Sequence, residues 1–169
     1  MINVIRVFFI SCSFLLIYPL AGKSNEISSK VEHPKTVLDE ILENPSLSTL
    51  AKAIVKTDLV EILEGEGPFT LFAPSNEAFA RLPSGTLEDW LKPNNKEKLT
   101  SILEYHIILG KMTLEDVKKN KGLMTLDGQH VRIKVDNNKV TVNNAAVVRS
   151  NLEYPNGIVH IIDQVLIPK

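Results

Sequence analysis

Cysteine, aromatic residues and an excess of charge of one sign are all scarce in this 169-residue chain. The one cysteine, Cys12, lies in an N-terminal apolar segment, so the rest of the chain has no disulfide and must rely on its core. The chain has 19 basic and 20 acidic side chains and no block of lysine and arginine. We therefore expect no nucleic-acid partner, because binding to a phosphate backbone needs a basic patch.

The residue patterns of catalytic and metal sites are also missing. No Gly-x-Ser-x-Gly segment occurs, and the four histidines, His33, His106, His130 and His160, lack the close spacing of a zinc site. The sequence predicts no cofactor, no metal ion and no enzymatic activity. An alternative is that the protein is a small envelope enzyme or chaperone, because the same fold can carry either a binding or an enzymatic function. A deep polar pocket that places His106 or His160 beside a carboxylate would favour that alternative, whereas a closed core around both favours a binding protein.

The first 22 residues predict a cleaved secretory signal peptide, because Arg6 is their only charge and Val7 to Leu20 is largely apolar. The apolar run falls short of the about 20 residues that cross a bilayer, so an uncleaved anchor is the weaker alternative, as is a lipoprotein acylated at Cys12. Residues 23–35 are polar and aperiodic, and we expect a disordered lead there. The predicted location is secreted, either periplasmic or extracellular.

Residues 36–169 have the pattern of one α+β domain. From Thr36 to about residue 106 the apolar spacing is helical, with a short strand pattern at 69–73, and beyond Gly110 it is mainly that of strands. Residues 130–135 and 139–142 alternate strictly and predict a β-hairpin. Residues 146–148 and 158–162 are continuous apolar runs, which predict strands covered on both faces. We expect a β-sandwich with a layer of helices from the N-terminal half.

Three segments in this order resemble the signature of the fasciclin-like adhesion domain. They are Thr70-Leu-Phe-Ala-Pro-Ser-Asn-Glu-Ala-Phe79, Leu103-Glu-Tyr-His106, and Asn156-Gly-Ile-Val-His-Ile-Ile-Asp163. The resemblance implies a β-sandwich with helices packed at one end and a role in extracellular adhesion or matrix contact. The only Asn-x-Ser/Thr triplet, at residues 44–46, contains proline and cannot accept an N-linked glycan, which favours a bacterial member. Its partner would then be a surface polysaccharide or a cell-surface or envelope protein.

Most motif residues have structural explanations. Pro74 ends a strand, Ser75 caps the next helix and Phe79 reaches the core. Asn156 and Gly157 are expected to form a turn that tolerates positive φ. The motif residues that we expect to be mainly structural are Thr70, Pro74, Ser75, Asn76, Phe79, His106, Asn156, Gly157, His160 and Asp163.

The candidate partner-binding residues are less directly indicated. In some animal members of the family the tyrosine-histidine pair is implicated in integrin contact, so Tyr105 is a candidate, although a core role for Tyr105 and His106 is favoured. Integrin-linked members also carry an aspartate before the Asn-Gly turn; Asn151 stands here instead, so integrin contact is doubtful. We expect residues 150–155 to form an exposed loop, with Asn151, Leu152, Glu153 and Tyr154 as the contact patch.

Overall fold

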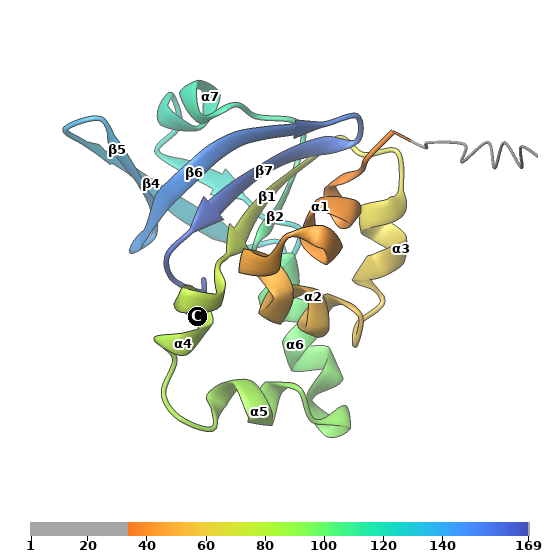
Figure 1. Cartoon of the computed structure of the whole chain (residues 1–169). Coiled ribbons are helices and arrows are strands. Elements are labelled where there is room, and N and C mark those ends of the chain that lie inside the picture. Colours follow the sequence, from red (N-terminus) through yellow and green to blue (C-terminus); the bar gives the residue numbers. More distant parts are fainter. Residues whose placement is uncertain (1–33, 169) are drawn as a thin grey trace, which may run out of the picture. The chain divides into compact units, whose positions relative to one another are not determined.

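The computed structural model describes residues 34–168, in which helices pack against a seven-stranded sheet (Figure 1). The predicted signal peptide and residues 23–33 of the predicted lead lie outside the described residues. The helices are α1 (Val37–Glu43), η1 (Pro45–Leu47), α2 (Ser48–Ile54), α3 (Leu59–Glu64), α4 (Asn76–Ala80), α5 (Thr86–Trp90), η2 (Pro93–Asn95), α6 (Lys96–Glu104) and α7 (Leu114–Lys118). The strands are β1 (Phe69–Pro74), β2 (Ile107–Leu109), β3 (Gly122–Met124), β4 (His130–Asp136), β5 (Lys139–Val142), β6 (Ala145–Tyr154) and β7 (Gly157–Ile162).

Helix α1 begins at Val37 because Thr36 caps it. The Thr36 hydroxyl accepts a hydrogen bond from the Asp39 amide at 3.2 Å, and the Asp39 carboxylate accepts one from the Thr36 amide at 2.7 Å. The same reciprocal cap, formed by Thr113 and Asp116, opens helix α7. Helix α7 was not predicted, although the Thr-x-x-Asp spacing at its start is readable in the sequence.

Strands β1 and β7 form the centre of the fold. They pair in parallel, with Phe72 opposite His160, and all of their residues are buried. Such burial on both faces explains the continuous apolar run of 158–162. Gly157 must be glycine because an added Cβ would lie 2.5 Å from the carbonyl oxygen of Phe69. The expected positive φ does not occur at Asn156 or Gly157, so a close approach of two strands explains this glycine.

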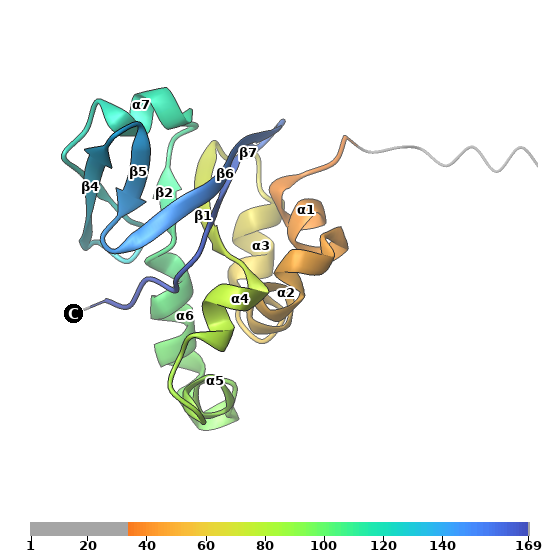
Figure 2. The ribbon, with the colours of Figure 1, turned by 60° about the vertical axis from the view of Figure 1, so that its left-hand side comes forward.

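Alternate residues of the central strands face two different core clusters. Leu71 and Val159 pack against the helices, in a cluster with residues such as Leu47 and Leu99. Phe72 and Ile162 face the opposite way and pack with residues of β4 and β5. Figure 2 shows the helices α1–α3 on one side of β1 and β7, and β4 and β5 on the other. We call these the helix-side cluster and the sheet-side cluster.

The strand order is β2-β1-β7-β6-β5-β4-β3, with only β1 and β7 parallel. The two ends of this order approach each other, because the amide of Leu126, just after β3, donates to the carbonyl of Ile107 in β2 at 2.8 Å. The α+β prediction is confirmed. The predicted sandwich is not confirmed: the strands belong to one bent, nearly closed sheet rather than two separate sheets.

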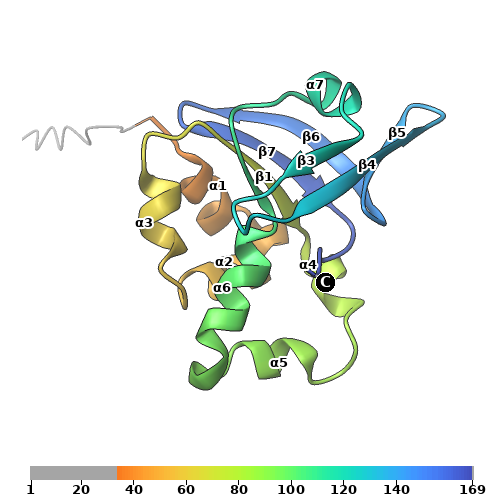
Figure 3. The same cartoon turned by 180° about the vertical axis from the view of Figure 1, so that it is seen from behind.

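The β4–β5 hairpin is confirmed and projects from the sheet (Figure 3). Asn137 and Asn138 form its turn at φ values of 45° and 67°, a conformation that asparagine tolerates better than most residues. Other expectations were wrong. Residues 150–154 belong to strand β6 instead of a loop, and Val148 in that strand is 61% exposed rather than covered on both faces.

Candidate functional site

The buried amide of Asn156 joins three parts of the helix-side structure. Its oxygen accepts a hydrogen bond from the Val37 amide at 2.9 Å, and its nitrogen donates to the carbonyls of Leu63 at 2.8 Å and Gly65 at 3.1 Å. Asn156 therefore fixes the start of α1 and the end of α3 to the β6–β7 turn. All three hydrogen bonds of the Asn156 side chain are made inside the domain.

The other polar motif residues are also bonded internally. Thr70 donates to the Gly110 carbonyl, and Ser75 caps α4 by accepting from the Ala78 amide. Asn76 donates to the Pro45 carbonyl at 2.8 Å. Asp163 accepts from the Ala146 amide at 2.7 Å and pairs with Arg81 at 2.8 Å. These contacts support a mainly structural role for the motif residues.

The His106 side chain is 1% exposed and lies between α6 and the C-terminal segment, residues 163–168. Its Nε2 accepts from the Leu166 amide at 2.9 Å, so Nδ1 carries the proton and donates to the Ile102 carbonyl at 2.7 Å. Burial lowers the pKa of His106 to about 4. His106 is therefore neutral near pH 7 and anchors the C-terminal segment.

The His160 side chain is completely buried on the sheet side, where its ring stacks on Phe72 with 5.6 Å between centroids. Its Nδ1 accepts from the Asn151 amide at 3.3 Å and its Nε2 donates to the Met112 carbonyl at 2.9 Å. Burial also lowers the pKa of His160. Both histidines thus lie in a closed core with both ring nitrogens engaged, which is the arrangement that favours a binding protein over an enzyme.

Within residues 34–168, no group of three or more histidine, cysteine, aspartate or glutamate side chains is placed to hold a metal ion. In the same range no helix combines the length and the apolar character needed to cross a bilayer.

Tyr105 is a core residue that connects the second motif to β4. Its side chain is 4% exposed, and its hydroxyl donates to the His130 carbonyl at 3.1 Å. The same hydroxyl accepts from Asn143, whose side-chain oxygen in turn accepts from the Arg132 amide at 2.9 Å. This series of hydrogen bonds fixes the β5–β6 turn to residues 130–132 of strand β4.

The predicted contact patch at residues 151–154 alternates in exposure along β6. Leu152 and Tyr154 are half-buried against the helix-side cluster, whereas Asn151 and Glu153 are exposed. Desolvation and a hydrogen bond to Glu40 raise the pKa of Tyr154 to about 12. Glu153 pairs with Lys111 at 3.1 Å, and the Asn151 side chain accepts from the Leu114 amide at 2.8 Å. The structure does not bring Tyr105 into this patch, because Tyr105 belongs to the sheet-side cluster.

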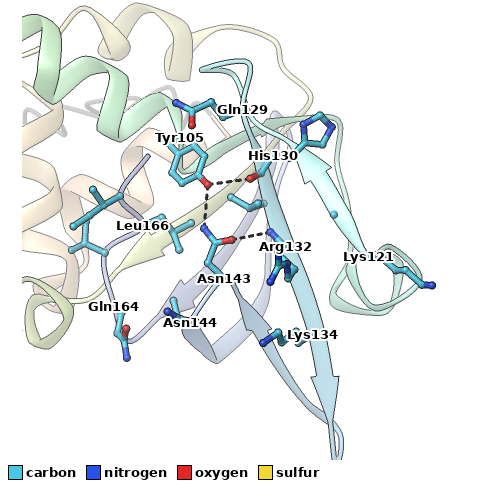
Figure 4. A pocket seen from close by; sticks show the side chains of 15 residues that line it. Tyr105, Lys121, Gln129, His130, Arg132, Lys134, Asn143, Asn144, Gln164 and Leu166 are labelled. Atoms are coloured by element: carbon cyan, nitrogen blue, oxygen red, sulfur yellow. Dashed lines mark hydrogen bonds between the residues drawn. The ribbon is translucent and has the colours of Figure 1, made fainter. Parts of the chain in front are cut away.

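A hollow of about 610 Å³ lies beside Tyr105, between β4, the β5–β6 turn and the C-terminal segment. Figure 4 shows Arg132 on one side of it, Leu166 on the other and Asn143 between them. Among residues 34–168, no acidic side chain lines the hollow. We call it the basic pocket; its polar lining residues are Tyr105, Lys121, Gln129, His130, Arg132, Lys134, Asn143, Asn144 and Gln164, and its other lining residues are Gly122, Val131, Ala145, Val165, Leu166 and Ile167.

The cations of the basic pocket are unpaired within the described part of the chain. Eight ion pairs occur there, and none includes Lys121, Arg132 or Lys134. The bonds of Arg132 and Lys134 run through their backbones. Their side chains are exposed and therefore available to a ligand.

This pocket is not predicted from the sequence, although one signal for it is present there. The alternation that predicts the β4 strand places Val131 and Ile133 in the sheet-side cluster, and therefore places His130, Arg132 and Lys134 together on the outer face. Lys121 immediately precedes β3, and the pairing of β3 with β4 brings it beside these basic residues. The pairing of Gly122 with Arg132 could not be foreseen from local pattern alone.

A second hollow, of about 330 Å³, lies between α2, α4 and the start of α5. Asn76 and Phe79 line it, and Glu88 is its only charged lining residue. It has no comparable concentration of charge.

The fold is that of a small α+β domain whose polar motif residues are bonded internally. Comparison with known proteins identifies the class: residues 45–168 match the family model "Fasciclin domain". The chain therefore belongs to the fasciclin domain family, as the three motifs predict.

Curated relatives of this chain occur in bacteria and animals. Protein sll1483 from Synechocystis is 45% identical over 133 residues, which cover 79% of this chain and 73% of that protein. Immunogenic protein MPB70 from Mycobacterium bovis is 38% identical over 130 residues, covering 74% of this chain and 65% of MPB70. Human periostin is 36% identical over 134 residues, which cover 79% of this chain but only 16% of periostin.

The fold also matches a solved structure, a FAS1 domain pair from the insect cell adhesion molecule fasciclin I. The TM-score is 0.71 at 23% identity, and the match covers 79% of this chain and 51% of that chain. This likeness concerns the fold alone.

Proposed function

We propose that this protein is an exported, non-catalytic binding module that contacts a surface polysaccharide or a cell-surface, matrix or envelope protein. The observation that carries the proposal is a contrast between two groups of polar side chains, one hydrogen-bonded inside the core and the other exposed at the surface. The two motif histidines considered for acid-base catalysis, His106 and His160, have both ring nitrogens bonded inside the core. The exposed side chains of Lys121, Arg132 and Lys134, which make no ion pair in the described part of the chain, instead line an open surface hollow. The family supports the same role, because the match to the fasciclin domain model agrees with the resemblance to fasciclin-like adhesion domains.

A binding screen tests this proposal. The purified protein is applied to arrays of immobilised polysaccharides and of cell-surface and matrix proteins, with heat-denatured protein as the control. We expect saturable binding to at least one polysaccharide or protein, unchanged by EDTA. Absence of saturable binding together with turnover of ester or glycoside substrates would overturn the proposal and favour the enzyme alternative.

Export is the second part of the proposal, and it rests on the N-terminal apolar segment. Cleavage near Gly22 would remove Cys12, the only cysteine. Reducing agents would then have no disulfide or thiol to act on in the mature chain. The intact mass of secreted protein tests this: we expect an N-terminus between Gly22 and Asn25. A retained Cys12, or lipid attached to it, would place the protein on a membrane instead.

The exposed face of residues 151–154 is a candidate contact within this proposal. Leu152 and Tyr154 pack on the core, so their replacement would confound binding with stability. Glu153 is exposed and its partner Lys111 lies on another segment, so Glu153→Ala tests the face with little effect on folding. Loss of partner binding by a variant that melts like the parent would support this contact, and undiminished binding would exclude Glu153 from it.

A further inference from the structure

We propose that the basic pocket binds acidic oligosaccharides, through their carboxylate or sulfate groups and their hydroxyls. This inference rests on the proposed binding function and specifies the class of ligand. Its starting point is the segregation of charge: the whole chain has a formal charge of -1, yet Lys121, Arg132 and Lys134 line one hollow whose lining, in the described part of the chain, includes no acidic side chain. Such an arrangement attracts anions locally, whatever the net charge of the chain.

The frame of the pocket is rigid, which favours binding because little ordering is needed. Hydrogen bonds from Asn143 to Tyr105 and from the Arg132 amide to Asn143 fix one side. On the other side, the bond between the Leu166 amide and His106 holds the C-terminal segment in place. Arg132 is thus presented on a fixed backbone, and its guanidinium suits bidentate recognition of a carboxylate or sulfate.

The uncharged lining indicates a ligand rich in hydroxyls. Asn144 and Gln164 are exposed and contribute amides, each of which can both donate and accept a hydrogen bond. Hydroxyl groups have the same dual capacity, so amides and sugar hydroxyls are matched partners. The volume of about 610 Å³ lies within the range of small-ligand sites, and the open mouth allows a longer chain to continue beyond it.

An acidic peptide fits the pocket less well. An extended peptide commonly binds by adding a strand to a free sheet edge, where its backbone groups find partners. Strand β4, which supplies most of the cations, is paired with β3 along residues 130–132 and with β5 along residues 133–136. At Arg132, beside the pocket, both backbone groups are already bonded, because the amide donates to the Asn143 side chain and the carbonyl accepts from the Asn143 amide.

The test is titration of the purified protein with tetragalacturonate, using the fully methyl-esterified tetramer as the uncharged control. We expect binding of the acid form that weakens as salt is raised, and no comparable binding of the ester. Dextran sulfate against dextran is the parallel arm, which distinguishes sulfate from carboxylate as the preferred anion. Binding in either acidic arm supports the proposal.

Charge-neutralising variants locate the site. Arg132→Gln/Lys134→Gln should weaken binding by about tenfold or more, because two charge-assisted contacts are lost. Lys52→Gln/Lys98→Gln removes the same charge from exposed positions on α2 and α6 and should change affinity by less than about twofold. Melting curves of all variants verify that they are folded.

Three outcomes would overturn the inference. They are absence of binding in both acidic arms, equal losses in the two double variants, and equal or tighter binding of tetraglutamate, which would assign the pocket to acidic peptides. If the acidic sugars do not bind while the screen described above still finds a partner, this inference fails and the proposed function stands.

Discussion

The motif residues and the basic pocket use polar side chains in opposite ways within one domain. The buried Asn156 side chain is bonded to α1 and α3. Two buried histidines act similarly: His106 is bonded to the C-terminal segment, and His160, in the sheet, is bonded to Met112. Arg132 and Lys134 are exposed, and their side chains make no ion pair in the described part of the chain. In this domain the polar residues of the segments by which the family is recognised make internal contacts, whereas the exposed cations of the proposed ligand site lie outside those segments.

The largest effect is expected from Asn156→Ala, on the scaffold side of this comparison. The substitution removes one acceptor and two donors, leaving the Val37 amide and the carbonyls of Leu63 and Gly65 without their partner. We expect the free energy of unfolding to fall by about 3 to 5 kcal/mol. Urea denaturation measures the change. A loss below about 1 kcal/mol would show that Asn156 is not the structural centre inferred here.

The second scaffold feature is the uncharged state of the buried His106, and it should make the stability of the domain depend on pH. Its pKa is about 4 in the folded protein and about 6.5 when unfolded, so the unfolded state takes up the proton first. Its contribution to stability is complete above pH 6.5, falls between pH 6.5 and 4, and then levels off after a loss of about 3 kcal/mol.

The His106→Asn variant isolates this effect from that of the carboxylates. Unfolding free energies of the parent and the variant are compared from pH 7 to pH 4.5. We expect the parent to lose more stability over this interval than the variant does. Parallel curves would mean that His106 does not control the acid response.

Tyr105→Phe sharpens the comparison because Tyr105 lies at the boundary between scaffold and pocket. The ring stays in the core, while its hydrogen bonds with the His130 carbonyl and Asn143 are lost. We expect a decrease of about 1 kcal/mol in the free energy of unfolding. Thermal melting measures it, and a loss as large as that of Asn156→Ala would show that the two hydrogen bonds of this hydroxyl contribute more than the modest stability expected of them.

The smallest change in stability is expected from Arg132→Gln/Lys134→Gln. Both side chains are exposed and unpaired in the described residues, so the free energy of unfolding should stay within about 0.5 kcal/mol of the parent. Urea denaturation tests this independently of any ligand. A marked loss of stability would place these cations with the scaffold and remove the contrast between the two regions.

Local signals in the sequence were enough to predict much of the architecture. The cap at Ser75 and the hairpin around Asn137 both depend on neighbouring residues and were predicted correctly. Two other outcomes depend on contacts between distant segments. The sheet closes through Leu126 and Ile107, and Gly157 is required by the approach of Phe69.

The candidate sites show the same limit. The alternation of residues 130–135 was read as a strand pattern, but its outer row of basic side chains becomes a site only when Lys121 and Gln164 are brought to it. Residues 150–155 are predicted from the sequence to form an exposed loop, but residues 150–154 belong to β6. They form a strand because β7 provides a pairing partner for Leu152 and Tyr154.

The bond between His106 and Leu166 has a practical consequence for measuring binding. It holds the C-terminal segment against the core, with Ile167 lining the basic pocket, so a tag or surface linkage at that end would stand at the mouth of the pocket. The chain enters the domain elsewhere, at Val37, whose amide is bound to Asn156 beside the β6–β7 turn. Residues 34–37 are not among the lining residues of the pocket, so biosensor experiments on this domain should attach the protein at that side of the domain rather than beyond Ile167.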